Sequence, residues 1–414
     1  MVHKHVITHL QTNELLSPAQ YGFRPGLGTG DAIFDFLDHT YREMDKGKLI
    51  STCFVDGSKA FDSVHHALLL RKCAALKIDN KVLKWLKSYL SNRRQVTTLN
   101  GVKSRECKVN FGVPQGSSLG PLMFLMFIND FPRHINNSKV FMYADDIVLI
   151  SSGDTYVESE RLLREDVEVT NEWCNRNCLT VNKKKTKVMR ITRNRIGGII
   201  PPLNISIGEN KLEDVSEYRY LGIAIDHRFT FKPQVNSIIR SISHKIYMLG
   251  RIRKYMDEEQ CVLVYKTMIV PYFDYANFAI ECTTDDLVGK LQKLQNRALR
   301  VCRFSNMYER SSATDLHTHF ELKTLDHRRD SQLLLMMFKK SKSNGHLIPL
   351  VERRTRGDHK IKFENPRNTY ASSDKNPWHR GVKAWDLLTA DTQKLEKSAA
   401  FKHAIKLIIP PPKS

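Results

Sequence analysis

The 414-residue chain has few of the features that mark secreted, membrane or disulfide-stabilised proteins. Its eight cysteines are too sparse for a disulfide scaffold and fit a reducing compartment. The most apolar stretch, Leu119 to Phe131, is too short to span a bilayer and is interrupted by Pro121 and Asp130. The first residues, MVHKHVITHLQTNELL, lack the long apolar region of a signal peptide. We therefore expect an intracellular protein, cytoplasmic or nuclear, without a membrane partner.

Two common functional-site patterns, a zinc site and a P-loop, are also missing from the sequence. Cys174 and Cys178 are the closest cysteines in the chain, but they do not form a CxxC pair and no histidine cluster follows, which argues against zinc. No GxxxxGK[ST] pattern occurs, which argues against a P-loop ATPase.

Asp and Glu total 44 against 65 Lys and Arg, a net charge of +21. This surplus favours nucleic acid as the partner, and the alternative is a soluble protein with a basic surface.

The order of apolar, turn and basic segments predicts an α+β fold in several parts. Up to about residue 195, predicted helices and strands mix without regular alternation. Gly197-Gly198 and Pro201-Pro202 then mark a linker or long loop. From 233 to 304 the chain is almost wholly helical and basic, and the polar, basic residues 351–380 predict a loop or a partly disordered segment. The other predicted helices cover 2–16, 32–44, 68–90, 122–129, 159–175, 333–342 and 398–408, and the predicted strands cover 50–55, 96–100, 106–109, 140–143, 147–150, 203–207, 211–212 and 218–225.

Asp56 is the first candidate site residue, because it follows a predicted apolar strand directly in FVDGSKAFD. Rigid backbone at a strand end can aim a carboxylate into a cleft. The alternative is that Asp56 caps the helix that follows, since Asp is a preferred N-cap residue.

Asp145 and Asp146 form an acidic pair between two apolar strands, in FMYADDIVLI. Adjacent carboxylates repel each other unless a cation or solvent compensates, although Asp is also an ordinary turn residue. Together with Asp56 they form an oxygen-only ligand set that suits Mg²⁺ or Mn²⁺. Two such ions can activate an attacking hydroxyl and stabilise a leaving pyrophosphate, which is the chemistry of nucleotidyl transfer. This interpretation predicts that the Asp56 and Asp145 carboxylates lie within about 5 Å of each other.

Three segments in this order resemble motifs A, B and C of reverse transcriptases: FVDGSKAFDSV, GVPQGSSLGPLMFLMFINDF and YADD. The variant is similar to that of non-long-terminal-repeat (LINE-type) retrotransposons, and of the jockey-like group in particular. LLSPAQYGFRPGLGTGDAI resembles the QxGFR segment of that family, LTVNKKKTKVM its motif D, EYRYLGIAID its motif E, and WHRGVKAWDLLTADTQKLEKSAAFKHAIK its C-terminal tail. The resemblance implies a right-hand polymerase that extends a DNA primer with dNTPs on an RNA template, using two Mg²⁺ or Mn²⁺ ions.

The resemblance assigns roles to matching residues. It implies that Asp56, Asp145 and Asp146 are catalytic metal ligands, with Asp146 acting mainly by its charge. Phe61 matches the family's aromatic steric gate, which excludes a ribose 2′-hydroxyl; the alternative is a helix core residue. Gln115 matches a contact to the incoming nucleotide or the template, in a loop that a structural turn would also explain.

Further nucleotide and primer contacts follow in the same way. Gly116 belongs to the same nucleotide-binding loop as Gln115. Lys185 matches the residue that approaches the leaving pyrophosphate, and its neighbours at 183 and 184 compete for that role. Tyr218, Leu221 and Gly222 match a primer grip. The implied domains are partial fingers over 1–50, a palm over 51–195, the primer-grip region over 196–232, a helical thumb over 233–310, and a partly loop-rich C-terminal region over 311–414.

The sequence also departs from the family pattern. Members carry a long region before QxGFR with an RPI-type segment that helps grip the triphosphate, and an endonuclease domain; neither pattern is found here. We therefore expect Met1 to be an internal methionine of a degraded element or of a truncated gene model. The alternative function is a catalytically impaired, nucleic-acid-binding remnant. Gly57 stands where the family usually has a bulky residue beside the metal site.

Overall fold

The computed structural model describes residues 1–192, 200–303, 312–342, 350–351, 362–363 and 375–408. The chain divides into two compact units, the first made of 1–32 with 47–216 and the second of 33–46 with 217–414. The boundary falls within helix α2 (Thr29–Asp45). Both helices and strands are present throughout, which confirms the predicted α+β class. The division into fingers, palm, thumb and C-terminal region stays a prediction.

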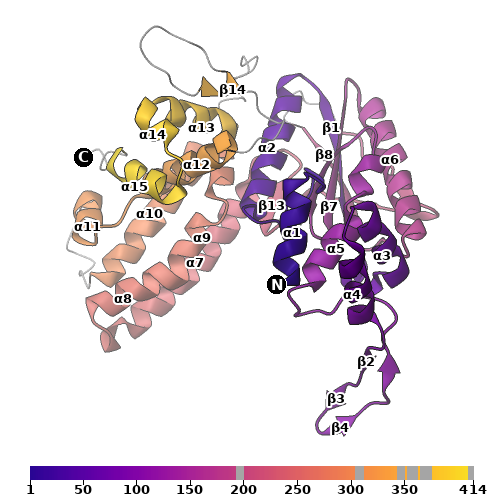
Figure 1. Ribbon diagram of the computed structural model, residues 1–414. Coiled ribbons are helices and arrows are strands. Elements are labelled where there is room, and N and C mark those ends of the chain that lie inside the picture. Colours follow the sequence, from indigo (N-terminus) through magenta and orange to yellow (C-terminus); the bar gives the residue numbers. More distant parts are fainter. Residues whose placement is uncertain (193–199, 304–311, 343–349, 352–361, 364–374, 409–414) are drawn as a thin grey trace. The chain divides into compact units, whose positions relative to one another are not determined.

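A five-stranded sheet is the centre of the first unit (Figure 1). The strands, in spatial order, are β11 (Glu213–Asp214), β8 (Lys187–Ile191), β1 (Leu49–Val55), β7 (Asp146–Gly153) and β6 (Lys139–Tyr143). All neighbours are antiparallel except β11 and β8. The predicted strands at 50–55, 140–143 and 147–150 are confirmed. The sequence did not predict β8, because charged residues at positions 187 and 190 interrupt its short apolar pattern.

Five helices accompany this sheet: α1 (Val2–Thr12), α3 (His66–Ala75), α4 (Asn80–Leu90), α5 (Gly120–Ile128) and α6 (Tyr156–Arg176). The single helix predicted over 68–90 is two helices, because Lys77 adopts a left-handed φ of 56° and Asp79 caps α4 through the Lys81 amide. Helix α6 packs against β1 and β7, and α5 packs against α3.

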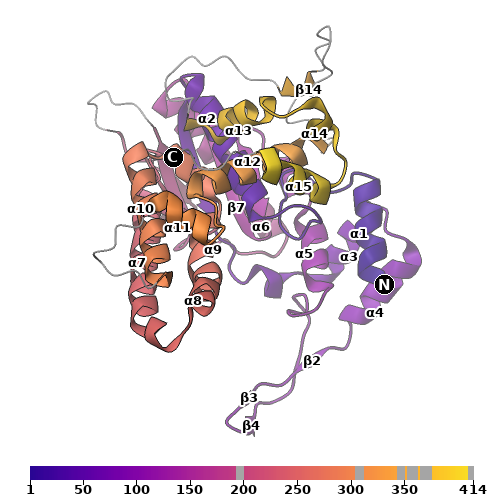
Figure 2. The same ribbon diagram turned by 90° about the vertical axis from the view of Figure 1, so that its left-hand side faces the viewer.

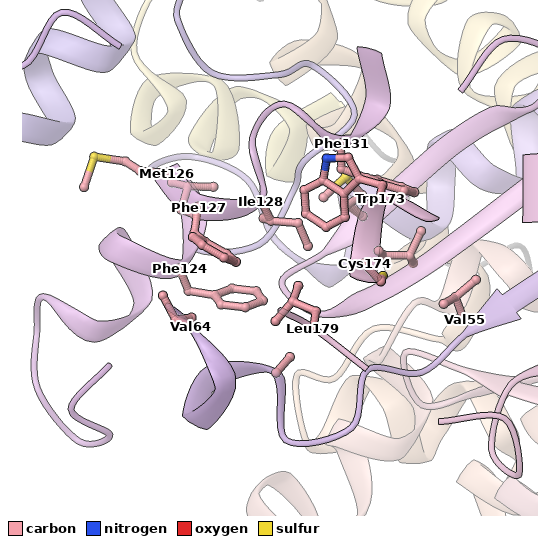
Figure 3. Close-up of a cluster of buried hydrophobic side chains, with 14 of the residues drawn as sticks. Val55, Val64, Phe124, Met126, Phe127, Ile128, Phe131, Trp173, Cys174 and Leu179 are labelled. Atoms are coloured by element: carbon pink, nitrogen blue, oxygen red, sulfur yellow. The ribbon is translucent and has the colours of Figure 1, made fainter. Parts of the chain in front are cut away.

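The hydrophobic core of the first unit explains the most apolar stretch of the sequence. Every side chain from Leu122 to Ile128 of α5 is buried. Figure 3 shows Phe124 and Phe127 of α5 in one cluster with Phe131 and with Trp173 from α6. This stretch is therefore a core helix, and none of the described helices combines the length and apolarity that a bilayer span requires.

A long hairpin leaves α4 and returns to the motif B loop (Figures 1 and 2). Its strand pairs are β2 (Arg94–Gln95) with β5 (Cys107–Lys108) and β3 (Thr98–Leu99) with β4 (Val102–Lys103). Asn100 and Gly101 have φ values of 50° and 81°, as a type I′ turn requires. The predicted hairpin around Asn100-Gly101 is confirmed.

The second unit is mostly helical, which confirms the helices predicted over 233–304 as far as the described residues extend. The described helical segments of this unit are α7 (Lys232–Ile252), η3 (Arg253–Tyr255), α8 (Glu258–Val264), η4 (Tyr265–Ile269), α9 (Val270–Asp274), η5 (Asn277–Cys282), α10 (Asp285–Cys302), α11 (Ala313–His319), α12 (Leu325–Lys342), α13 (Pro377–Asp386), α14 (Ala390–Lys394) and α15 (Ser398–Ile408). One hydrophobic core joins α7 to α10, and Ile242 and Leu291 are both fully buried in it.

Short strand pairs complete both units. They are β9 (Ser206–Ile207) with β10 (Asn210–Lys211), β12 (Glu217–Tyr220) with β13 (Ile223–Asp226), and β14 (Leu350–Val351) with β15 (Lys362–Phe363). The single strand predicted over 218–225 is wrong, because Leu221 and Gly222 both have positive φ and fold the segment into a hairpin.

The predicted loop over 351–380 is wrong at its end. Residues 352–361 and 364–374 lie outside the described residues, but α13 begins at Pro377. Trp378 and Trp385 of this helix are fully buried, so two aromatic rings replace the aliphatic pattern that sequence analysis expects of a core helix. Arg380 of α13 forms ion pairs with Glu281 and with Asp330, and its Nη2 lies 2.8 Å from Asp330 Oδ1. The eight cysteines of the chain are all free.

Candidate active site

The register of three strands brings the predicted acidic residues to one end of the sheet. Val55, the last residue of β1, pairs with Ile147 of β7, so Asp56 and Asp146 are the next residues beyond that pair. Tyr143 of β6 pairs with Asp146, which leaves Ala144 and Asp145 as the turn. Ala144 adopts the left-handed φ of 57° that this tight turn needs.

Gly57 shows how closely the motif A and motif C segments approach. A Cβ atom on Gly57 would lie 4.0 Å from the Cβ of Asp145 and 3.2 Å from that of Ala60. A larger residue there would press on Ala60 and touch the acidic turn. The alternative that Asp56 caps the next helix is wrong, because that helix is η1 (Ala60–Ser63) and its N-cap is Lys59.

The charge of Asp56 acts on both carboxylates of the acidic turn. Partial burial raises the pKa of Asp145, and the Asp56 charge raises it further, against a backbone hydrogen bond that lowers it. Partial burial, then the charges of Asp145 and Asp56, raise the pKa of Asp146 to about 6. Among the described residues there is no group of three or more His, Cys, Asp or Glu side chains that could hold a metal ion.

Asp146→Asn is therefore expected to stabilise the folded chain in cation-free buffer. A carboxyl whose pKa is raised from 3.8 to about 6 by folding destabilises the fold when it is ionised. This penalty is complete above about pH 6 and vanishes as the pH falls below 3.8, where both states become protonated. Discounted for solvent exposure, the gain near neutral pH is on the order of 1 kcal/mol. Urea unfolding at neutral pH and at about pH 4 measures it, and an equal gain at both pH values would contradict this explanation.

The QYGFR segment holds the acidic turn in place, a role that sequence analysis did not assign to it. Gln20 is fully buried, and its Oε1 accepts the Ala144 amide at 3.0 Å while its Nε2 donates to the Ala144 carbonyl at 3.3 Å. The Tyr21 amide donates to the Met142 carbonyl at 2.8 Å. A Cβ on Gly22 would lie only 2.4 Å from the Ala144 nitrogen. The QxGFR pattern is the sequence signal for this role, because it combines a polar Gln20 with a glycine at position 22, where a side chain would meet the acidic turn.

The motif B loop lies along the segment that contains Phe61. The Val113 amide donates to the Phe61 carbonyl at 2.9 Å, and a Cβ on Gly112 would meet the Asp62 carbonyl at 2.8 Å. Gln115 is exposed and its Nε2 donates to Asp62 Oδ1 at 2.7 Å. Gly116 is exposed with a φ of 77°. Motifs A and B therefore share one surface.

Phe61 is half-buried at this surface. Its ring stacks on Phe124 of α5 with centroids 4.2 Å apart, and it meets the exposed Phe23 edge-on at 6.0 Å. One part of the ring therefore supports the core while another part faces outward.

The motif D segment passes beside Asp56. The Asn182 amide donates to the Asp56 carbonyl at 2.8 Å, and the Asp56 amide donates to Thr186 Oγ1 at 3.2 Å. The turn between Asn182 and Thr186 carries three exposed lysines: Lys183, Lys184 and Lys185. Because all three lysines are exposed, each of them stays a candidate for the pyrophosphate contact.

The predicted primer-grip residues lie in the second unit. Tyr218 lies in β12, while Leu221 and Gly222 form the turn to β13. The turn is supported by Tyr275, whose hydroxyl donates to the Leu221 carbonyl at 2.5 Å and whose ring lies 3.2 Å from a Cβ built on Gly222. Sequence analysis missed Tyr275, because its partner lies more than fifty residues away along the chain.

Comparison with known proteins agrees with this arrangement. The chain is 29% identical over 323 residues to the probable RNA-directed DNA polymerase from transposon BS of Drosophila melanogaster, covering 75% of this chain and 35% of the relative. It is 26% identical over 325 residues to the RNA-directed DNA polymerase from mobile element jockey of Drosophila funebris, with the same coverage. The chain thus spans about a third of the length of these relatives, and the resemblance to jockey-like elements is confirmed.

Among solved structures, telomerase from Candida tropicalis in complex with a telomeric RNA fragment matches with 10% identity and a TM-score of 0.42, over 99% of this chain and 56% of that chain. A family model described as reverse transcriptase (RNA-dependent DNA polymerase) matches residues 1–225, the part that contains the sheet and its acidic turn. By that match, which covers more than half of the chain, the protein belongs to the reverse transcriptase family.

Proposed function

We propose that this chain is the polymerase domain of a LINE-type retrotransposon protein and that it adds deoxynucleotides to a primer 3′-hydroxyl on an RNA template. The observation that carries the proposal is the convergence of Asp56 with Asp145 and Asp146 at one end of β1 and β7. The relatives named as RNA-directed DNA polymerases support the choice of reaction.

The acidic residues fit a divalent cation by their chemistry. Carboxylates whose pKa is raised by burial and by neighbouring negative charge, as those of Asp145 and Asp146 are, are stabilised by a nearby cation. Mg²⁺ typically takes one or two protein carboxylates and completes its coordination with water and substrate phosphate oxygens. Such a site does not require three protein ligands, and the described residues contain no group of three. Asp56 and Asp145 would hold two Mg²⁺ or Mn²⁺ ions, with Asp146 contributing mainly charge. Such ions, when bound, assist the attacking hydroxyl and neutralise the leaving pyrophosphate.

Residues of motifs B, D and E would position the substrate. The loop with Gln115 and Gly116 lies against motif A, so it would contact the nucleotide or the template there. Lys185, or one of its two exposed neighbours, would approach the pyrophosphate from the turn beside Asp56. The turn at Leu221 and Gly222, fixed by Tyr275, would support the primer end.

Helix α7 supports a role of the second unit in holding duplex phosphates. It exposes Tyr247 with the Arg251 guanidinium over its ring at 6.0 Å, and Lys245 Nζ lies 5.0 Å from the Tyr272 ring centroid. Cationic and aromatic groups of this kind bind nucleic acid in a salt-dependent way.

Primer extension with the purified chain, an RNA template, dNTPs and Mg²⁺ tests the proposal. We expect template-dependent extension. Salt-dependent nucleic-acid binding without extension would favour the alternative function, a catalytically impaired remnant. Absence of binding at low salt would contradict both functions.

The proposed gate makes a separate prediction. Phe61→Val should raise ribonucleotide incorporation relative to deoxynucleotide incorporation by about 10-fold or more, because the outward part of the ring would no longer oppose a 2′-hydroxyl. Single-nucleotide extension with each sugar type measures the ratio. Phe111→Val is the matched control, since Phe111 is 51% exposed beside the same loop. Unchanged discrimination in Phe61→Val would assign Phe61 to core packing against Phe124 alone.

A further inference from the structure

Helix α4 and the hairpin that follows it form a basic surface apart from the acidic site. Between Asp79 and Lys108 there are eight basic residues and two acidic residues. The lysines of α4 are exposed, and every residue from Arg94 to Lys108 is exposed. A ribbon with no buried side chain adds nothing to a core, so another explanation for its length and charge is needed.

Three side chains stack in a row along α4 into the start of the hairpin. Trp85 stacks on Tyr89 with ring centroids 5.4 Å apart and planes 13° from parallel. The Arg93 guanidinium lies 4.5 Å from the Tyr89 ring centroid, and Arg93 Nε donates to the Tyr89 carbonyl at 2.9 Å. Both groups contact the Tyr89 ring, while 42% of the Trp85 surface stays exposed. Such a row is rigid before any ligand arrives.

The hairpin extends this surface from α4 (Figures 1 and 2). At its tip, Leu99 pairs with Val102, and both side chains are 73% exposed. The neighbouring pair, Thr98 with Lys103, points to the opposite side of the ribbon because side chains alternate along a strand. Farther down, Arg94 pairs with Lys108. The ribbon thus offers phosphate-binding cations along its length and an apolar pair at its end.

We propose that the α4 surface and hairpin bind single-stranded nucleic acid, with a base stacked on the exposed ring of Trp85 and phosphates on the surrounding lysines and arginines. The excess of positive charge selects a polyanion. An exposed aromatic face selects a nucleic acid whose bases are unpaired and free to stack. This inference goes beyond the proposed polymerase function, because it involves neither the acidic residues nor catalysis.

Tryptophan fluorescence tests this proposal directly, because the other three tryptophans, Trp173, Trp378 and Trp385, are at most 4% exposed. The full chain is titrated with oligo(rU), oligo(dT) and a blunt duplex, each of about 20 nucleotides. We expect both single strands to quench the emission and the duplex to quench it much less. Comparison of oligo(rU) with oligo(dT) shows whether RNA or DNA is preferred.

Two substitutions of Trp85 separate stacking from folding. Trp85→Phe should abolish the quenching while retaining most of the affinity, and Trp85→Ala should weaken single-strand binding by roughly 5- to 100-fold. The double variant Arg94→Gln with Lys103→Gln should reduce the salt dependence of binding. Tyr255→Ala, which removes an exposed aromatic ring from η3, is the matched control and should leave the quenching unchanged.

Three outcomes would overturn the proposal. Quenching that persists in Trp85→Phe would come from a buried tryptophan, and equal quenching by duplex would exclude base stacking. Stronger quenching by anionic phosphatidylserine vesicles than by oligo(rU) would assign the surface to a membrane. Because Trp85→Phe keeps an aromatic ring, its thermal unfolding midpoint should match that of the wild type, which keeps the test independent of folding.

Discussion

Asp145→Asn is expected to lower primer extension on the order of 1,000-fold or more. The substitution keeps the size of the side chain but removes the charge that opposes Asp56 across the strand ends. Loss of one charged contact at the reacting phosphate costs about 100- to 1,000-fold, and loss of a cation ligand adds to it. Single-turnover extension at saturating dNTP and Mg²⁺ measures the effect on the chemical step.

The control for this variant is Glu168→Gln, which removes an exposed carboxylate from α6. It should extend primers as the wild type does, and both variants should bind template and primer with wild-type affinity. Extension by Asp145→Asn within about 10-fold of the control would mean that Asp145 does not act in catalysis.

Gly22→Ala is the second substitution with a large expected effect. The new Cβ would lie 2.4 Å from the Ala144 backbone nitrogen, where no flexible side chain can move aside. The acidic turn would have to shift, and a displacement of about 1 Å at a reacting site can cost 100-fold in rate. We therefore expect about 100-fold slower extension, although Gly22 carries no functional group.

Gly28→Ala is the matched control in the same segment. A Cβ on Gly28 would meet only an Asp31 carboxylate oxygen, at 3.9 Å, so its extension rate should be close to that of the wild type. Thermal unfolding of both variants separates displacement of the turn from loss of the fold. Near-normal extension by a stably folded Gly22→Ala would show that the QYGFR segment does not position the acids.

The strand ends that carry the site could be predicted from the sequence, because the signals are local. Apolar residues before Asp56 and on both sides of Asp145 predict strands, and a two-residue turn fixes which residues lie at the end. Periodicity alone does not show that these strands lie side by side. The resemblance to reverse transcriptase motifs implied that their ends meet in one site. The long hairpin was predicted for the same local reason, from Asn100 and Gly101.

Contacts between distant segments could not be predicted. Gln20 bonds to Ala144, and the clash that requires glycine at position 22 arises from the same remote turn. Helix α13 was not predicted, because its buried face consists mainly of Trp378 and Trp385 and shows no periodic aliphatic pattern. In each case the decisive partner lies far away in the chain, and the local sequence pattern does not name it.

Cleavage of the backbone by bound Fe²⁺ tests most directly whether Asp56 and Asp145 share a cation site. Fe²⁺ replaces Mg²⁺ in oxygen-ligand sites, and with ascorbate and peroxide it cuts the chain near the ion. In the presence of dNTP we predict cuts near residue 56 and near residue 145 together, both suppressed by excess Mg²⁺ and both lost in Asp145→Asn. Cleavage at only one of these segments, or at neither, would contradict the shared site.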